Sequence, residues 1–115
     1  MTVYAVQEPM RRDHASGEMV PAVDLRPAGQ WGAIDILLPS SMHMVNTAPA
    51  VRTLRSKLRD FGDEDYILAV GSPGAIGAAV AVAANMNRGR VKMLQWEKRE
   101  KGYIEIHLDV HGGTV

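Results

Sequence analysis

Residues 33–97 alternate short apolar runs with helix-like segments, and this alternation constrains the fold more than any other feature. The apolar runs are AIDILLP at 33–39, YILAV at 66–70 and RVKMLQWE at 90–97. Helices are expected between them, at about 48–61 and about 73–86. Strands that alternate with helices are typical of parallel strands joined by crossovers, so we predict a three-stranded parallel β-α-β-α-β unit. The continuous apolar character of 33–39 favours a buried central position in the sheet.

Two further strands are expected outside this unit. TVYAVQE at 2–8 predicts a first strand, which Pro9 ends. YIEIHLDV at 103–110 alternates apolar and polar residues, which predicts a half-solvated antiparallel strand near a sheet edge. The expected fold is one α/β domain over 1–115, a loosely Rossmann-like sandwich of two or three layers. It has about five strands, two helices, an antiparallel C-terminal hairpin and a tail at 112–115.

Residues 9–32 form a connection of unusual length, rich in proline and glycine. Connections longer than about 12–15 residues are uncommon in compact domains and are often functional or mobile. We favour a surface hairpin here, with an extended piece near 19–24. If both helices lie on one face of the sheet, this segment or a second subunit must cover the other face.

Both helices carry boundary signals. For the first helix we predict Thr47 as the N-cap and Gly62 as the residue after its end. For the second we predict Ser72 as the cap, Pro73 at the first position and Gly77 in close contact with the sheet. The second helix is apolar around most of its circumference, which predicts burial on more than one side, by residues 9–32 or by a homodimer contact.

Composition excludes several classes of function. The chain has 13 basic and 13 acidic residues, so it lacks the overall basic charge that drives non-specific nucleic-acid binding. It has no cysteine, which removes disulfides, thiolate metal sites and cysteine nucleophiles and fits a reducing cytoplasm. We expect a cytoplasmic protein, because no apolar run reaches signal-peptide character or the roughly 20 residues of a membrane span.

Polar residues gather after two of the predicted parallel strands. In open α/β sheets, ligands bind beyond the carboxyl ends of the strands, where helix N-termini also point their N–H groups. The loops 40–47 and 71–74 are expected at that edge. The predicted ligand-binding residues are Ser40, Ser41, His43, Asn46, Thr47, Ser72 and Gly74.

The glycines at the start of the second helix fit no nucleotide motif. Gly71, Gly74 and Gly77 are spaced as Gly-x-x-Gly-x-x-Gly, whereas a dinucleotide fingerprint needs Gly-x-Gly-x-x-Gly. A Walker loop is excluded because no lysine occurs between Lys57 and Lys92. A capped helix start explains the segment, and weak anion binding there stays open.

A second candidate site is the hairpin at 88–101, where basic residues are interleaved with aromatic ones. Such a surface can follow a phosphate backbone and stack bases. The predicted nucleic-acid-binding residues are Arg88, Arg90, Lys92, Trp96, Lys98 and Arg99. The zero net charge argues against this function, and Trp96 has the alternative of packing in the core beside Leu94.

Two runs carry a resemblance to known proteins: VQEPMRRDHASGEMVPAVDLRPAGQWG and LRSKLRDFGDEDYILAVGSPGAIGAA. They resemble small, uncharacterised α/β proteins encoded in bacteriophage genomes. The resemblance implies an accessory protein that works in the host bacterial cytoplasm, and it assigns no functional residue.

The sequence thus favours a small non-catalytic accessory protein that binds a protein partner or forms a homodimer. One alternative is an anionic small-ligand or nucleotide-binding domain using 39–47 and 71–75. The other is a single-stranded nucleic-acid binder using the 88–101 hairpin. We predict no catalytic residue, no metal site, no cofactor and no membrane contact.

Overall fold

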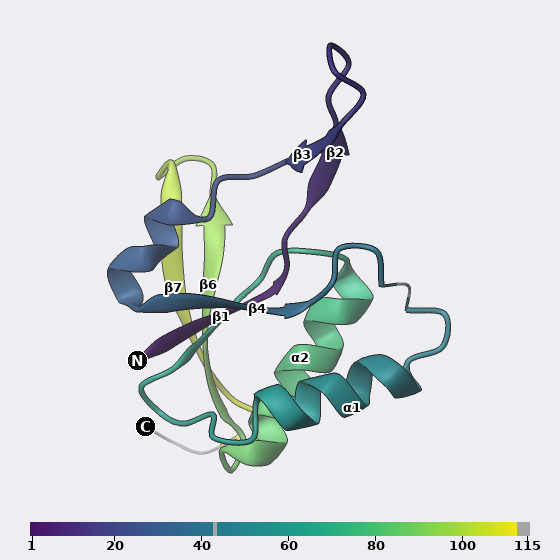
Figure 1. Ribbon diagram of the computed structural model, residues 1–115. Coiled ribbons are helices and arrows are strands. Elements are labelled where there is room, and N and C mark those ends of the chain that lie inside the picture. Colours follow the sequence, from purple (N-terminus) through teal and green to yellow (C-terminus); the bar gives the residue numbers. More distant parts are fainter. Residues whose placement is uncertain (43, 113–115) are drawn as a thin grey trace.

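A mixed five-stranded sheet organises the chain, with strand order β4-β1-β5-β6-β7. The structure is a computed structural model that describes residues 1–42 and 44–112 (Figure 1). A separate two-stranded sheet, β2-β3, lies in the connection between β1 and β4. The elements are β1 (Thr2–Gln7), β2 (Met10–Arg12), β3 (Met19–Pro21), the 3-10 helix η1 (Arg26–Trp31), β4 (Ala33–Leu38), α1 (Ala48–Lys57), β5 (Tyr66–Leu68), α2 (Pro73–Met86), β6 (Arg90–Glu97) and β7 (Gly102–Asp109).

The first strand occupies a position that the sequence analysis did not assign to it. Tyr4 of β1 lies opposite Asp35 of β4 on one side and Ile67 of β5 on the other, and both pairings are parallel. The strand therefore separates β4 from β5, so the central position predicted for 33–39 is wrong, whereas β5 and β6 are parallel neighbours. Burial explains the order: β1 is buried at four of its six positions, whereas the exposed Asp35 belongs to an edge strand, not a central one.

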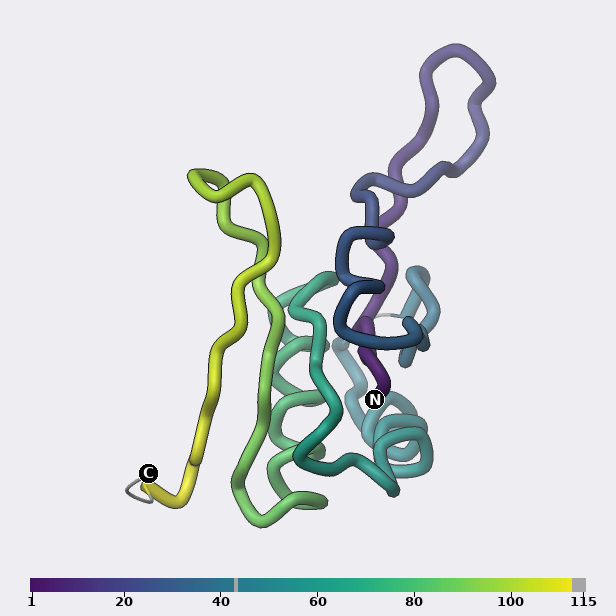
Figure 2. The backbone as a smooth tube through the Cα atoms, turned by 90° about the vertical axis from the view of Figure 1, so that its left-hand side faces the viewer, coloured from purple at the N-terminus to yellow at the C-terminus, as the bar shows by residue number. Residues whose placement is uncertain are grey.

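The two long helices cover one face of the sheet, and η1 covers part of the other (Figure 1, Figure 2). Leu54 of α1 and Ala79 of α2 pack in one buried cluster with Ile67. On the opposite face, Ala28 of η1 packs in a cluster with Leu94. Since both long helices lie on one face, residues 9–32 or a second subunit were expected to cover the other face. The helix η1 belongs to that connection and buries part of this face.

The start of α2 is built as predicted. Ser72 has extended dihedral angles, its Oγ accepts the N–H of Ala75 at 3.3 Å, and Pro73 follows at the first helical position. The role predicted for Gly77 is wrong, because Gly77 is exposed and a Cβ there would meet nothing within 4 Å. Ala81 is exposed as well, so one side of α2 faces solvent.

The helix α1 begins as predicted, with Thr47 at its N-cap position, but the capping contact and the end of the helix differ from the prediction. Thr47 has helical dihedral angles and its side chain makes no capping hydrogen bond; Asn46 Oδ1 accepts the N–H of Ala48 instead, at 3.3 Å. The helix ends at Lys57, well before Gly62. The N–H of Gly62 donates to Asp65 Oδ2 at 3.0 Å, so a side-chain contact shapes the turn that follows the helix.

The predicted surface hairpin within 9–32 is confirmed. The strands β2 and β3 pair antiparallel, with Met10 opposite Pro21 and Arg12 opposite Met19. The hairpin closes at its base where the N–H of Ala22 donates to the carbonyl of Pro9 at 2.7 Å. Residues 9–22, called the arm below, project away from the five-stranded sheet (Figure 1). Within the described residues, no helix has the length and apolar character needed to cross a membrane.

Candidate functional site

Gln7, at the end of β1, holds together the loops at the carboxyl edge of the sheet. Its side-chain Nε2 donates to the carbonyls of Pro39 at 3.1 Å and Met42 at 3.3 Å. Its Oε1 accepts the N–H of Ser72 at 3.0 Å. Gln7 is only 4% exposed, and all three hydrogen bonds are partly buried. Gln7 was not among the predicted site residues. The signal available in the sequence was a polar residue at the end of an apolar strand.

Gly71 is a glycine because Gln7 lies against it. Its φ is +113°, a conformation that residues with a side chain rarely adopt. A Cβ at this position would lie 2.7 Å from Gln7 Cβ and 2.9 Å from Gln7 Oε1. The first glycine of the suspected phosphate loop is therefore explained by a contact inside the protein.

A cavity of about 550 Å³ opens beside this contact, and it contains part of the predicted ligand site. It is lined by Gln7, Glu8, Pro9, Met10, Met19, Ser40, Ser41, Met42, Gly71 and Ser72. The structure thus brings Ser40, Ser41 and Ser72 together, as predicted. Asn46, Thr47 and Gly74 are not part of the lining. His43 lies outside the described residues.

The N–H groups at the start of α2 are largely engaged within the chain. That of Ser72 donates to Gln7, that of Ala75 donates to Ser72 Oγ, and Pro73 has no N–H. A bound anion would have to compete with these contacts. Anion binding at this edge remains a prediction.

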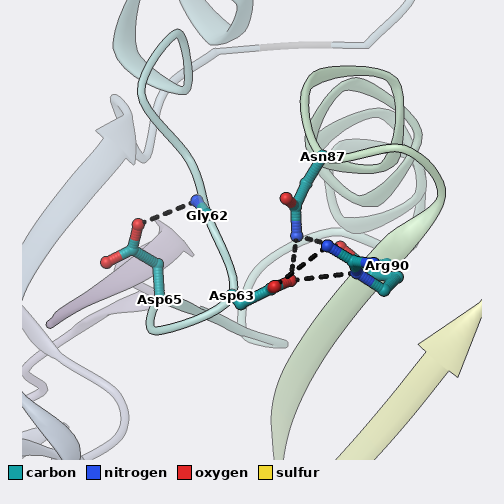
Figure 3. Close-up of polar contacts among 5 residues, drawn as sticks. All are labelled: Gly62, Asp63, Asp65, Asn87 and Arg90. Atoms are coloured by element: carbon teal, nitrogen blue, oxygen red, sulfur yellow. Dashed lines mark hydrogen bonds and ion pairs between the residues drawn. The ribbon is translucent and has the colours of Figure 1, made fainter.

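A network of polar contacts fixes the opposite end of the sheet (Figure 3). Arg90 donates to Asp63 through Nε at 3.1 Å and Nη2 at 2.9 Å. The buried Asn87 donates from Nδ2 to Asp63 Oδ1 and to the carbonyl of Arg90, both at 2.9 Å. The hydrogen bonds from Asn87 and then Arg90 lower the pKa of Asp63 below its ordinary value of 3.8. Asp65 beside them accepts the N–H groups of Gly62 and Thr2, so the loop before β5 is held on both sides.

Two of the predicted nucleic-acid-binding residues already have partners. Arg90 is paired with Asp63, and Lys92 Nζ lies 4.3 Å from the centre of the Tyr66 ring. Trp96 is 47% exposed and contacts Tyr103 edge-on, with ring centres 5.2 Å apart. The remaining side chains of the set are exposed: Arg88, Lys98 and Arg99. Nucleic-acid binding through this hairpin remains a prediction.

A further polar cluster joins η1 to β7. Glu105 Oε1 accepts the Trp31 Nε1–H at 2.7 Å and the Tyr66 hydroxyl at 3.4 Å. Glu105 Oε2 lies 3.0 Å from His107 Nε2. The contact with His107, followed by that with Trp31, lowers the pKa of Glu105. The cluster ties the helical turn to the outer strand, whereas the alternation in 103–110 predicted only a solvated face for Glu105 and His107.

The arm makes its hydrogen bonds mainly within itself. At its tip, Ser16 Oγ donates to Asp13 Oδ2 at 2.9 Å, and Arg12 Nη1 donates to the carbonyl of Gly17 at 2.7 Å. Met10 at its base and Met19, which pairs with Arg12 farther along the arm, line the cavity beside Gln7. The rest of the arm is mostly exposed, including Met19, which is 55% exposed.

Comparisons with known proteins place this chain in one family. Searches of curated proteins and of solved structures gave no match. A comparison with protein families matches residues 1–110 to the family described as phage Pam3 gp32-like protein. The match spans nearly the whole chain and supports the resemblance to uncharacterised phage-encoded proteins. The chain belongs to the phage Pam3 gp32-like protein family.

Proposed function

We propose that this phage-encoded chain is a non-catalytic accessory protein that binds another protein through its arm, residues 9–22. The observation that carries the proposal is the position of the arm, which projects from the sheet and packs chiefly on itself (Figure 1). The paired strands within it are only three residues long. A two-stranded hairpin of this kind is at best marginally stable in water, so a contact surface elsewhere would supply the missing burial.

The side chains of the arm suit a protein partner. Met19 presents an exposed thioether, which adapts to irregular apolar surfaces, and Val20 beside it is half-buried. The charges are mixed, with Arg11 and Arg12 on β2 and Asp13 and Glu18 toward the tip. A mixed surface fits protein recognition better than a phosphate backbone, which requires an excess of basic residues.

Site-specific photocrosslinking in phage-infected cells tests the proposal. A photoreactive side chain at Met19 is expected to capture one protein reproducibly, whereas the same group at the exposed Arg52 of α1 is expected to capture none specifically. The captured protein is then purified, and its binding to the unmodified chain is measured. Absence of specific capture at Met19, or equal capture of the same protein at Arg52, would contradict the proposal.

A second candidate function is anion or nucleotide binding at the carboxyl edge. The neighbouring strands β1 and β5 send their connections in opposite directions. The chain leaving β1 continues to β4 on one side of the pair, and the chain leaving β5 continues to β6 on the other side. In doubly wound sheets ligands bind at such a point, and the cavity beside Gln7 lies there. As part of this proposal, the strand order supports a fold that is loosely Rossmann-like.

A thermal-shift series with inorganic phosphate and nucleotides tests this second candidate. A ligand at 100 times its dissociation constant adds about 2.7 kcal/mol of stability, a large effect for a domain of this size. The shift should disappear in a Ser40→Ala/Ser41→Ala double variant, since both residues line the cavity. No response to millimolar ligand would exclude this function.

A further inference from the structure

The strand β7 has one free edge. It pairs antiparallel with β6, and no other strand in the part of the chain that the structure describes pairs with its outer side. Figure 2 shows β7, in yellow, at the outer margin of the sheet. An open strand of eight residues presents unpaired N–H and C=O groups to any strand of matching length.

The other edge of the sheet is protected differently. At β4, Lys57 Nζ donates to the backbone carbonyl of Ile36 at 2.9 Å, so a charged side chain occupies that edge. Charged side chains, lysine above all, are a common protection of sheet edges against unwanted pairing, and here the lysine comes from the neighbouring helix α1. The edge at β4 is therefore occupied by a charged side chain, whereas the edge at β7 is the one open to another strand.

Hydrogen bonding within the sheet fixes which groups of β7 point outward. The N–H of Val110 donates to the carbonyl of Gly89 beside β6, at 2.9 Å. Because backbone groups alternate in direction along a strand, Ile104, Ile106 and Leu108 direct theirs toward β6. The outward backbone groups belong to Tyr103, Glu105, His107 and Asp109.

The face of β7 on the helix side is apolar and incompletely covered. Ile106 lies opposite Met93 and Leu108 lies opposite Val91, so these side chains point to the face that α2 covers. They are only half-buried, because α2 packs over β1 and β6 rather than over β7. Val110 at the strand end is 58% exposed and lines a cavity of about 400 Å³ together with Val80 and Ala81 of α2.

We propose that two copies of this chain pair their β7 strands antiparallel, about a twofold axis at Ile106, to form one continuous sheet. The partner is a second copy because the strand is complementary to itself in this register. Glu105 of each copy lies opposite His107 of the other, and Ile104 lies opposite Leu108. The Glu105–His107 pair within each chain, 3.0 Å apart, then becomes part of a ring of alternating acidic and imidazole groups.

The charges select this register over its competitor. In an antiparallel pair of β7 strands, the outward backbone groups of one copy must face those of the other. Only two registers meet this condition and still pair seven of the eight residues of β7. In the other register the axis falls on Glu105, which then lies opposite its own copy. Like charges placed directly opposite destabilise a pair of strands, whereas opposite charges stabilise it. The proposed interface does not involve the arm and stands whether or not the arm binds a partner.

Cysteine crosslinking tests both the interface and its register, since the chain has no cysteine of its own. In the proposed dimer Ile106 faces its copy in a non-hydrogen-bonded pair, with Cα atoms about 4.5 Å apart, which a disulfide can bridge. Mild oxidation of Ile106→Cys should give a covalent dimer of twice the 12.5 kDa chain mass. Ile104→Cys and Leu108→Cys should each stay uncrosslinked alone and crosslink when mixed.

A charge exchange provides the second measurement by sedimentation equilibrium, with circular dichroism confirming that each variant folds. The unmodified chain should sediment as a dimer. His107→Glu places carboxylates opposite one another and should raise the dissociation constant at least about tenfold. Glu105→His/His107→Glu restores opposite pairing and should recover most of the affinity. A monomeric unmodified chain, or Ile104→Cys crosslinking to itself as fast as Ile106→Cys, would overturn the proposal.

Discussion

At the scale of single residues, the contact between Gln7 and Gly71 explains a glycine that the sequence left ambiguous. A phosphate loop and a tight packing contact both call for glycine, because both need a backbone free of a side chain. The structure supplies the packing contact, with Gln7 Oε1 bonded to the neighbouring Ser72 N–H. No ligand is needed to account for the motif.

Two glycine substitutions should shift stability in opposite directions. Gly71→Ala forces a Cβ against Gln7 at a positive φ and should cost more than about 1 kcal/mol. Gly77→Ala, in the exposed face of α2, should gain about 0.5–1 kcal/mol, because alanine favours the helix and has open space there. Urea denaturation measures both; a neutral Gly71→Ala would contradict the proposed contact.

Removing the Gln7 amide should loosen the carboxyl edge. Gln7→Met keeps a side chain of similar length but leaves the carbonyls of Pro39 and Met42 and the N–H of Ser72 without this partner. Unpaired buried polar groups cost about 1–3 kcal/mol, and because these groups are only partly buried we expect a loss near the lower end of that range. Hydrogen exchange at the Ser72 amide should accelerate in parallel. An unchanged exchange rate would show that another group satisfies this N–H.

The Asp63 carboxylate should make stability depend on pH. Its pKa in the folded protein is lowered by Asn87 and Arg90, so the ionised form contributes stability above about pH 4. That contribution is lost as the pH falls through the lowered folded-state pKa. The difference in unfolding free energy between the unmodified chain and Asp63→Asn should therefore be largest at neutral pH and shrink in acid. A difference that is constant with pH would contradict this assignment.

At the scale of elements, local patterns predicted most strands and helices, but they could not predict contacts between distant segments. Ser72 and Pro73 mark the start of α2 through residues adjacent in sequence, and that prediction is confirmed. Gln7 meets its partners 32 to 65 residues away, which leaves no local pattern to recognise. Thr47 occupies the N-cap position of α1 as predicted, but Asn46, one residue earlier, supplies the side-chain hydrogen bond that was expected from Thr47.

The central position predicted for 33–39 was the largest error at this scale, and its cause is physical. An apolar run such as 33–39 fits either a central strand or an edge strand whose inner face is buried. In the structure Ala33, Asp35 and Ile36 of β4 are exposed, whereas four of the six residues of β1 are buried. Order in a parallel sheet depends on competition among all the strands for the centre, so one run considered alone does not determine it.

The arm should be the least protected β structure in the isolated protein. Its amides depend on a short hairpin without a core, whereas those of β1 lie between two strands. Hydrogen exchange at the β2–β3 pairs should therefore be far faster than at Val3 or Ala5, whose side chains are buried. Protection of the arm equal to that of β1 would contradict its independence from the body.

At the scale of the whole molecule, we propose two separate binding surfaces for this phage-encoded protein. The arm is proposed to bind a different protein, and β7 is proposed to pair with a second copy. Together they would present two arms on one extended sheet, and two linked contacts bind a repeated partner more tightly than one. Each surface is tested separately, because neither set of variants alters the other surface.

We propose that the arm binds the partner and that the rest of the chain, the body, folds without the arm. Since Pro9 and Ala22 are already joined by a hydrogen bond of 2.7 Å, residues 10–21 can be replaced by a two-residue Asn-Gly turn. The decisive measurement is the affinity of this shortened chain for the partner captured at Met19, with thermal unfolding showing that the body is intact. We expect a melting temperature within a few degrees of the full chain and an affinity at least about a hundredfold weaker. An intact body that binds as tightly as the full chain would contradict binding through the arm.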